Sequence, residues 1–430
     1  MSLASLSVPD FVAHLREEGI RRFALVTKND RVVASHDALT PLAESVRENR
    51  VDYDGHEGFF AELCPETGVL FGACIHRTCR GQGAGGVRYW RYDTVHDFLR
   101  DGLRLAQGMT YKNALAGLWW GGGKGLMAKG LNPEEASPEV RRRIYARYGD
   151  FMTSLRGCYV TAEDVGTSVQ DMAAIFSRTR FTTCIPPELG GSGNPSGPTA
   201  LGVLRGMEAA LSHRDMGTLE GKTVAVQGLG HVGEPLIALL HEAGVARVMG
   251  SDIDPGAVAL AERYPRLEVR IVDRGDTTAL AAEADIVAPC AVGGVLHEGT
   301  IAALRAPIVC GAANNQLLDP ATDGARLHAQ GVTYVPDFLV NRMGIVTCAD
   351  EAAGFVDDDP RLSDHLGREH DNSVYRLALE VLGRATKDGR PAADIALELA
   401  RERSFELHPI FGHRGQRIID SLMARDWAQV

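Results

Sequence analysis

The sequence predicts an α/β protein of two lobes, one containing a mixed sheet and the other a doubly wound parallel sheet. Its 430 residues, 45% of them hydrophobic, exceed the ~250–300 residues at which a single core stops growing. From residue 199 to about 340, short apolar segments alternate with helical ones, a pattern typical of a parallel sheet covered by helices. Helical periodicity returns from residue 371 onward.

Several elements can be predicted in the first 190 residues. Aromatic and aliphatic residues punctuated by glycine predict strands between 58 and 92. Apolar residues at helical spacing predict a helix over 94–117. The segment LWWGGGKG is too rich in glycine to continue that helix, so we expect a loop that carries Lys124. A charged helix at about 138–155 then leads into a short strand, CYVTAED.

The middle and end of the chain differ in composition and in predicted secondary structure. The stretch PPELGGSGNPSGP (186–198) is typical of a long loop or a hinge between lobes. Beyond it, we expect five short apolar segments to form strands: KTVAVQ, ARVMGSD, ADIVAPC, APIVCG and VTYVPD. In the tail, NSVYRLALEVLGRATKDG and ADIALELARER have helical periodicity.

Composition excludes several classes of partner. The net charge of −11 argues against nucleic acid or an anionic membrane, because a backbone binder needs a positive surface. The N-terminal segment has Asp10 and no basic flank, unlike a secretory signal, and no uncharged stretch approaches the ~18–20 residues of a membrane helix. Eight cysteines scattered through apolar segments suit reduced thiols. We therefore expect a cytoplasmic protein.

Two groups of residues resemble metal ligands. Cys74, His76 and Cys79 lie close together, but GVLFGACIHRT reads as a strand and no second ligand pair follows at zinc spacing. His408 and His413 form a lone pair of histidines, which is usually a matter of packing or of the surface. The sequence thus predicts no metal site.

A glycine motif predicts a nucleotide site in the second lobe. The strand KTVAVQ leads into GLGHVG, a helix leaves it, and the strand ARVMGSD follows within one Rossmann-type βαβ unit. The glycines permit a tight turn, close approach to a pyrophosphate and close helix packing, while the helix N-terminus attracts the phosphates. The residues expected to contact the cofactor here are Gly228, Gly230, His231, Val232 and Gly233.

An acidic residue indicates which dinucleotide is bound. Asp252 ends the second strand of the unit, about 20 residues past the glycines, where a carboxylate accepts hydrogen bonds from a ribose 2′-hydroxyl. The 2′-phosphate of NADP would meet a negative charge there, so we expect NAD. The alternative is that Asp252 or Asp254 merely caps the next helix.

Two lysines and a carboxylate are candidates for catalysis. Lys112 and Lys124 lie in apolar, uncharged surroundings, and burial together with mutual repulsion would lower the pKa of one of them toward neutrality. The three glycines before Lys124, Gly122 among them, are expected to leave space for a small ligand. Asp164, in TAEDVGTS, follows a strand and precedes a glycine, although carboxylates in such places are often helix caps.

These residues belong to ordered blocks that resemble the glutamate/leucine/phenylalanine/valine dehydrogenases, and most closely the branched-chain and aromatic amino-acid members. The resemblance covers about residues 55–385. It rests on the blocks GAGGVRYWRY, GMTYKNALAGLWWGGGKG, TAEDVGTSVQDM, GNPSGPTALGVLRGMEAAL, VAVQGLGHVGEPL, DIVAPCAVGGVL, GAANNQL and YVPDFLVN. No single block would suffice, but so many in order make chance similarity very improbable.

The resemblance implies a role for each matching residue. Lys112 would hold the substrate α-carboxylate, Lys124 would activate water, and Asp164 would exchange protons with the amino group. Asn341 would hydrogen-bond the polar end of the substrate. The nicotinamide half of the cofactor would be contacted by Thr199, Cys290, Ala291 and Asn314. The implied reaction is the reversible, NAD-dependent oxidative deamination of an L-amino acid.

The resemblance also implies an organisation of the chain. Residues 1–190, completed by 345–430, would form the substrate-binding and oligomerisation lobe, and 195–344 the NAD-binding Rossmann lobe. The protein would be a homo-oligomer that acts on a small molecule.

Some residues depart from the family pattern. Arg342-Met343 stands where the family usually has Ala-Gly, which could reshape the substrate pocket or anchor an acidic group. Trp119 and Trp120 could wall a pocket or pack in the core. Ala84 replaces the lysine with which glutamate dehydrogenases hold a side-chain carboxylate, so we expect a bulky apolar substrate. The alternatives are a glutamate dehydrogenase and a catalytically retired NAD-binding regulator.

Overall fold

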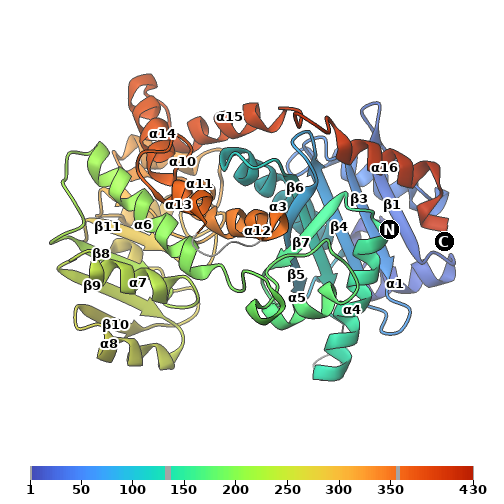
Figure 1. Cartoon of the computed structure of the whole chain (residues 1–430), viewed down its shortest axis with the longest axis horizontal. Helices are drawn as coiled ribbons and strands as arrows, with labels where there is room; N and C mark the ends of the chain where they lie inside the picture. The colour runs from blue at the N-terminus through green and yellow to red at the C-terminus, as the bar shows by residue number, and fades with distance from the viewer. Residues whose placement is uncertain (1, 131–136, 355–358, 430) are drawn as a thin grey trace. The chain divides into compact units, whose positions relative to one another are not determined.

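The computed structural model describes residues 2–130, 137–354 and 359–429 (Figure 1). The chain divides into two compact units. Unit 1 comprises residues 1–194, 348–355 and 401–430, and unit 2 comprises 195–347 and 356–400. The tail is thus divided differently from the expected 345–430, because helix α14 (Val374–Asp388) packs against helix α6 (Ser196–His213) of unit 2.

Unit 1 is built on a seven-stranded mixed sheet, in the order β2-β1-β3-β4-β6-β5-β7. The first strands pair antiparallel, whereas β5, β6 and β7 run parallel. This arrangement confirms the mixed sheet expected for the first lobe. The strands are β1 (Arg22–Lys28), β2 (Arg31–Ala34), β3 (Gly58–Leu63), β4 (Leu70–Arg77), β5 (Gly83–Trp90), β6 (Gly121–Ala128) and β7 (Tyr159–Glu163).

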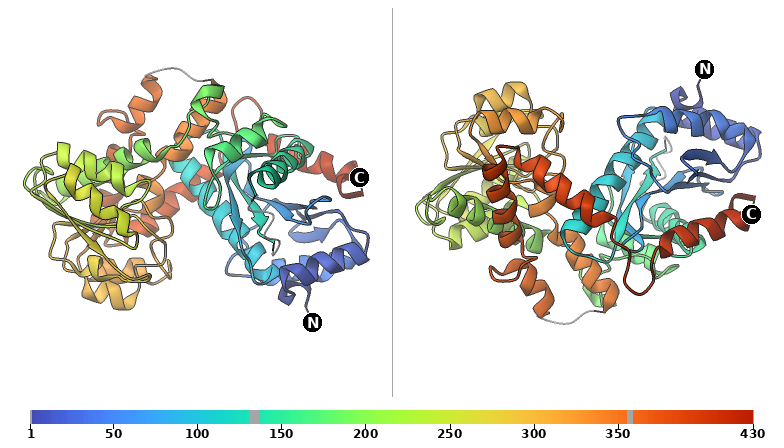
Figure 2. Two further views of the ribbon diagram at one scale, coloured as in Figure 1. Left: turned by 90° about the horizontal axis from the view of Figure 1, so that it is seen from below. Right: turned by 90° about the horizontal axis from the view of Figure 1, so that it is seen from above.

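Helices cover both faces of this sheet (Figure 2). On one face, α3 (Val95–Leu115) places Phe98 edge-on against Phe59 of β3, within a core shared with α1 (Val8–Glu17) and α2 (Thr40–Glu48). On the other face, Tyr148 of α4 packs edge-on against Phe71 of β4. The helices of that second face are α4 (Pro138–Ser154), α5 (Val169–Phe176) beside it, and α16 (Arg414–Ala424) near the C-terminus.

The glycine-rich segment before Lys124 is not the loop that the sequence suggested. It forms β6, a central strand between β4 and β5. A Cβ atom on Gly122 would lie 2.0 Å from Thr110 Oγ1 of α3, and one on Gly123 would lie 2.5 Å from the Tyr159 ring. The glycines therefore admit close packing of Thr110 and Tyr159 against the strand.

Unit 2 contains a parallel sheet of six strands in the order β10-β9-β8-β11-β12-β13. The strand order reverses beside β8 (Thr223–Gln227), because β9 and β10 lie on one side of it and β11 to β13 on the other. This order is that of a doubly wound sheet, as expected. The other strands are β9 (Arg247–Asp252), β10 (Leu267–Ile271), β11 (Ile286–Pro289), β12 (Ile308–Val309) and β13 (Thr333–Tyr334). The edge strand β10 was missed from sequence.

The remaining helices are short, apart from α15. They are α7 (Gly233–Glu242), α8 (Leu260–Arg263), α9 (Glu298–Ala303), α10 (Asp323–Ala329), α11 (Asp337–Val340), α12 (Met343–Ala353), α13 (Pro360–Leu366) and α15 (Ala392–Ser404). No helix in the described ranges is long and apolar enough to cross a bilayer. All eight cysteines are free thiols.

Candidate catalytic and cofactor sites

The structure brings two of the predicted catalytic residues into direct contact. Lys124 Nζ lies 2.8 Å from Asp164 Oδ2, and their side chains are 4% and 19% exposed. Lys124 is in the middle of β6, and Asp164 directly follows β7, which runs parallel to β6 on the far side of β5. A Cβ atom on Gly86 of β5 would lie 2.7 Å from Asp164 Cβ, so this glycine lets the carboxylate approach the lysine.

Arg88 of β5 completes this charge cluster, although the sequence analysis gave no role to this residue. Its Nε donates to Asp164 Oδ2 at 3.0 Å, and its Nη1 donates to Asp101 Oδ1 at 3.1 Å. Arg88 and Lys124 share a face, because Arg88 pairs with Leu126 and side chains alternate along a strand. Arg88 is thus a second charged neighbour of Lys124, in addition to Asp164.

The cluster shifts the acidity of both partners. Burial lowers the pKa of the Lys124 ammonium, and Arg88 lowers it further, while Asp164 opposes the shift. For Asp164, burial favours the neutral acid, but the cations of Lys124 and Arg88 outweigh it and hold the pKa of the carboxyl below its usual value. A buried lysine with a lowered pKa next to an ionised carboxylate is suited to proton transfer.

The other candidates for substrate binding lie on elements packed around this pair. Lys112 is partly buried near the end of α3, the helix that packs on β6. Ala84 is buried in β5 and pairs with Gly122 of β6. Asn113, which sequence reasoning missed, is fully buried and donates from Nδ2 to the Gly121 carbonyl at 2.5 Å. This bond fixes α3, and hence the backbone at Lys112, against the start of β6.

The glycine motif has the geometry of a phosphate-binding turn. Gly228 has φ +94°, and a Cβ there would lie 2.8 Å from the Ala291 backbone nitrogen. A Cβ on Gly233 would lie 2.0 Å from the Gly228 carbonyl oxygen, so only glycine lets α7 start so close to the strand. A Cβ on Gly230 would meet no atom within 4 Å, and His231 beside it is exposed. The turn therefore leaves its outer side accessible at the N-terminus of α7, as a pyrophosphate requires.

Asp252 supports this turn from the end of β9. Its Oδ2 accepts the Leu229 backbone N–H at 2.7 Å, and its Oδ1 accepts the Asp254 N–H at 2.8 Å. Asp254 itself caps the following 3-10 helix by accepting the Gly256 N–H. The capping role that was the alternative for either residue thus belongs to Asp254, and Asp252 stays partly exposed beside the glycines.

The remaining cofactor candidates follow the carboxyl ends of neighbouring strands in unit 2. Cys290 and Ala291 follow β11, and Asn314 follows β12. Asn341 donates from Nδ2 to Asn314 Oδ1 at 2.8 Å, while its own Oδ1 is buried and has no hydrogen-bond partner among the described residues. Thr199, near the start of α6, is 8% exposed. The open glycine turn and the unsatisfied amide oxygen fit a bound dinucleotide or substrate at this edge of the sheet.

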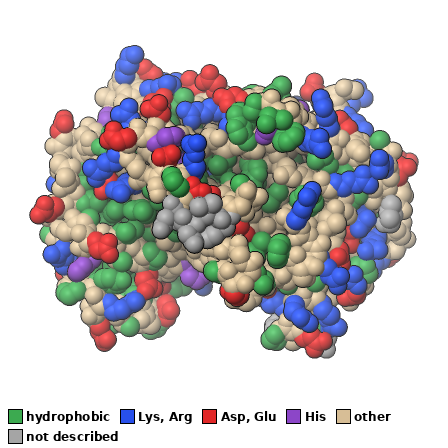
Figure 3. Space-filling view, viewed as in Figure 1, with side chains coloured by type: hydrophobic (Ala, Val, Ile, Leu, Met, Phe, Trp, Pro, Cys, Tyr) green, Lys and Arg blue, Asp and Glu red, His purple; other side chains and the backbone are tan. Residues whose placement is uncertain are grey.

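Two departures from the family pattern have structural explanations. Arg342 is fully buried in unit 2, and its Nη2 donates a hydrogen bond to the Asn372 carbonyl. Because its guanidinium is bound inside the unit, Arg342 is a poor candidate for anchoring an acidic substrate. Trp119 is 43% exposed. The Arg80 guanidinium lies over its ring, and the tilted His408 ring contacts it beside an exposed apolar segment, Phe405–Phe411. Figure 3 shows hydrophobic side chains gathered between α15 and α16. Trp119 is therefore at the surface and not in the core.

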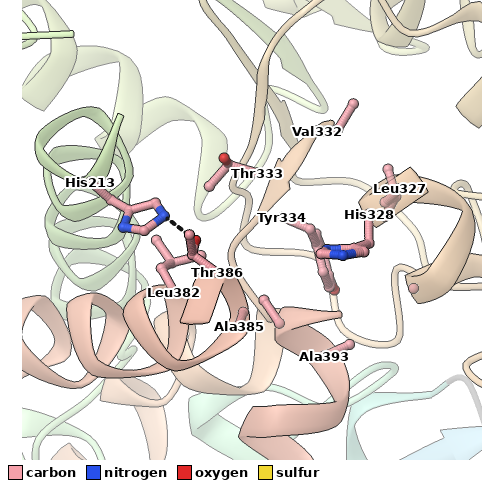
Figure 4. Close-up of a pocket in the computed structure, with 12 residues that line it drawn as sticks. His213, Leu327, His328, Val332, Thr333, Tyr334, Leu382, Ala385, Thr386 and Ala393 are labelled. Atoms are coloured by element: carbon pink, nitrogen blue, oxygen red, sulfur yellow. Dashed lines mark hydrogen bonds between the residues drawn. The ribbon is translucent and has the colours of Figure 1, made fainter. Parts of the chain in front are cut away.

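Two pockets in the described residues, one in each unit, lack the catalytic and cofactor residues that the sequence predicted. A pocket of about 60 Å³ in unit 2 is lined by α6, α10, β13 and α14, with His213 hydrogen-bonded to Thr386 at 3.1 Å (Figure 4). It is far smaller than the ~300–1,000 Å³ of ordinary ligand pockets. An open pocket of about 450 Å³ in unit 1 includes Arg88 and Asp101, and charged side chains of both signs line it. Such a lining does not suit an apolar side chain.

Comparison with known proteins places these sites in a family context. The family model described as the dimerisation domain of Glu/Leu/Phe/Val dehydrogenases matches residues 70–181. The model described as Glutamate/Leucine/Phenylalanine/Valine dehydrogenase matches residues 190–262 and 256–356.

Similar proteins extend over most of the chain. A leucine dehydrogenase from Geobacillus stearothermophilus is 40% identical over 82% of this chain and 91% of its own. A valine dehydrogenase from Streptomyces coelicolor is 38% identical over 83% of this chain and 94% of its own. The crystal structure of L-tryptophan dehydrogenase from Nostoc punctiforme superposes with a TM-score of 0.66 at 31% identity, covering 84% of this chain and 98% of that one.

Proposed function

This chain belongs to the glutamate/leucine/phenylalanine/valine dehydrogenase family, and we propose that it catalyses the reversible, NAD-dependent oxidative deamination of a bulky apolar L-amino acid to the 2-oxo acid and ammonia. The observation that carries the proposal is the buried pair of Lys124 and Asp164. The names of the similar leucine, valine and tryptophan dehydrogenases support an apolar substrate. The dimerisation domain named in the matching family model supports a homo-oligomer.

The residues of unit 1 would bind the substrate, transfer protons and stabilise charge in the transition state. Lys112 would bind the substrate carboxylate, which a cation at the end of α3 suits. Lys124, with its lowered pKa, would take a proton from water that attacks the iminium carbon, and Asp164 would exchange a proton with the departing amine. The cations of Lys124 and Arg88 would stabilise negative charge on oxygen in the transition state.

The residues of unit 2 would bind the cofactor. Gly230 and the N-terminus of α7 would face the pyrophosphate, Gly228 and Gly233 would allow the close turn, and Asp252 would face the adenosine ribose. When bound, NAD would accept the hydride from the substrate Cα. Asn341 would offer its unsatisfied Oδ1 to a donor N–H of a ligand.

The first prediction concerns the pH dependence that Arg88 sets. Because Arg88 lowers the pKa of Lys124, replacing it by Gln should raise that pKa. Activity that depends on the neutral amine should then require a higher pH, so the acidic limb of the kcat profile should move toward alkaline pH. The exposed Arg91→Gln is the control and should leave the profile unchanged. If the acidic limb of the profile does not move in Arg88→Gln, the group that titrates there is not Lys124.

The second prediction concerns cofactor choice. The unaltered protein should prefer NAD to NADP, because the Asp252 carboxylate would repel a 2′-phosphate. Asp252→Asn retains an acceptor for the Leu229 N–H but removes the charge, so the ratio of kcat/KM for NAD to that for NADP should fall. Asp254→Asn, which alters an exposed cap, should preserve the ratio. Equal kcat/KM for both cofactors in the unaltered protein would contradict the assignment.

The third prediction tests the proposed function through its substrate. A panel of L-amino acids should give NADH at alkaline pH with leucine, methionine, phenylalanine or tryptophan, whereas glutamate should be poor because Ala84 cannot pair a distal carboxylate. Ala84→Leu should shift kcat/KM from large toward small aliphatic substrates, by about 10–200-fold per methylene of mismatch. Glutamate as the best substrate would indicate a glutamate dehydrogenase. Tight NADH binding without any turnover would indicate a retired regulator.

A further inference from the structure

Three side chains that commonly bind metals meet in unit 1, outside the charge cluster described above. Glu57 precedes β3, Cys79 follows β4, and His413 precedes α16. His413 Nε2 lies 2.9 Å from Glu57 Oε1 and 3.9 Å from Cys79 Sγ. All three ligand atoms lie within 4.8 Å of one another.

The arrangement does not suit a proton relay. In a Cys-His-acid relay, the thiol and the carboxylate bond to opposite nitrogens of the imidazole ring. Here Cys79 and Glu57 both approach Nε2 of His413, so a proton cannot pass from one to the other through the ring. Instead the sulfur, nitrogen and oxygen atoms converge on one point.

Two of the three distances between ligand atoms are close to those of a tetrahedral zinc site, and the third, from Cys79 Sγ to Glu57, is at most 4.8 Å. Bond lengths of about 2.3 Å to sulfur and 2.0–2.2 Å to nitrogen or oxygen imply about 3.4–3.6 Å between ligand atoms. The observed separations of 2.9 and 3.9 Å differ from these values by about half an ångström. Small rotations of partly exposed side chains can make up this difference.

Hydrogen bonds and one close packing contact hold the three ligand residues in place without a metal. The Thr78 N–H donates to Glu57 Oε1 at 2.7 Å, and the Thr78 hydroxyl donates to Oε2. A Cβ atom on Gly415 would lie 2.3 Å from Thr78 Oγ1, so glycine there lets α16 start close to this threonine. The His408 N–H donates to the Cys79 carbonyl at 3.0 Å. The segment that carries His413 is therefore docked on the end of β4 by its own backbone.

Burial of the three groups is uneven in a way that suits a bound cation. Glu57 is 8% exposed, whereas Cys79 and the His413 side chain are partly exposed. A cation can thus enter from solvent and keep a water molecule as a fourth ligand. With Glu57 and Cys79 ionised, the ligands carry two negative charges, which a divalent cation neutralises.

We propose that Glu57, Cys79 and His413 bind a divalent cation of borderline softness, with Zn²⁺ as the best match to one sulfur, one nitrogen and one oxygen ligand. Cys79 would lose its thiol proton and coordinate as a thiolate, so binding releases a proton. The cation would join residues 57, 79 and 413 and fasten α16 to the sheet of unit 1. The sequence-based expectation that Cys79 and His413 serve packing or the surface would then be wrong.

The test uses Co²⁺ as a spectroscopic substitute for Zn²⁺ on the full-length, metal-free protein. One equivalent of Co²⁺ should produce a thiolate-to-cobalt charge-transfer band, and Zn²⁺ should abolish it. Cys79→Ser should remove the band, and His413→Ala should weaken Co²⁺ binding at least ~100-fold, the upper end of the loss when only a supporting partner of a metal ligand is removed. Cys290→Ser and His96→Ala, which match the ligands by residue type and lie outside the cluster, should give the same band and the same Co²⁺ affinity as the unaltered protein.

Thermal unfolding gives a second readout if His413→Ala fails to fold. Zn²⁺ should raise the Tm of the unaltered protein and of Cys290→Ser, but not that of the nearly isosteric Cys79→Ser. The proposal is overturned if Co²⁺ gives no charge-transfer band at millimolar concentration. It is equally overturned if the band and the Tm shift survive in Cys79→Ser, because the thiol would then lie elsewhere.

Discussion

Lys124→Ala is expected to lower kcat at least ~100-fold, the lower end of what a positioned acid or base contributes. The reason is that burial and Arg88 lower the pKa of Lys124, so that it can act as a base close to neutral pH. Asp164 keeps Arg88 as an ion-pair partner at 3.0 Å, and unit 1 should therefore remain folded. The measurement is steady-state turnover of the best amino acid of the panel.

Two controls make the result specific. Lys129, which follows the end of β6, is exposed, and Lys129→Ala should retain normal turnover. NADH should bind Lys124→Ala with unchanged affinity, because the glycine turn belongs to unit 2. Near-normal kcat in Lys124→Ala would remove this lysine from the mechanism.

The elements that sequence could predict are those whose signals are local. Helix α3 has apolar residues at helical spacing and the Thr94–Asp97 capping box at its start, and its bounds differ from the expected range by one or two residues. The glycine motif was placed correctly because the flanking strand and helix have their own patterns. The edge strand β10 was missed because four of its five residues have exposed or half-exposed side chains, so it has no continuous apolar run.

Contacts between distant residues set the limit of the sequence-based predictions. The strand β6 begins with three glycines, which normally disfavour strands, and it is stabilised by Thr110 and Tyr159 packing against those glycines. The role predicted for Asp164 came from family resemblance. Gly86 and Arg88, which contact Asp164, lie in a different block, GAGGVRYWRY, and nothing local to either block joins them. Glu57, Cys79 and His413 are up to 356 positions apart, and no spacing rule could join them.

Gly122→Ala is expected to destabilise unit 1 strongly. The added Cβ would lie 2.0 Å from Thr110 Oγ1, 2.3 Å from the Thr110 backbone nitrogen and 2.4 Å from the Ala106 carbonyl oxygen. Two of these are backbone atoms of α3, so the whole helix must shift. We expect a loss of about 3 kcal/mol, the upper end for overpacking, and hence a Tm lower by roughly 6–12 °C.

Gly108→Ala is the matched control for this prediction, because Gly108 lies in the same helix and a Cβ there meets no atom within 4 Å. It should raise stability by about 0.5–1 kcal/mol through helix propensity alone. The comparison decides why glycine precedes Lys124. If Gly122→Ala keeps the parental Tm but loses affinity for the amino acid, the glycine would exist to make space for a ligand, as the sequence first suggested. A lowered Tm would instead assign it to the packing of α3 on β6, which holds Lys124 in position.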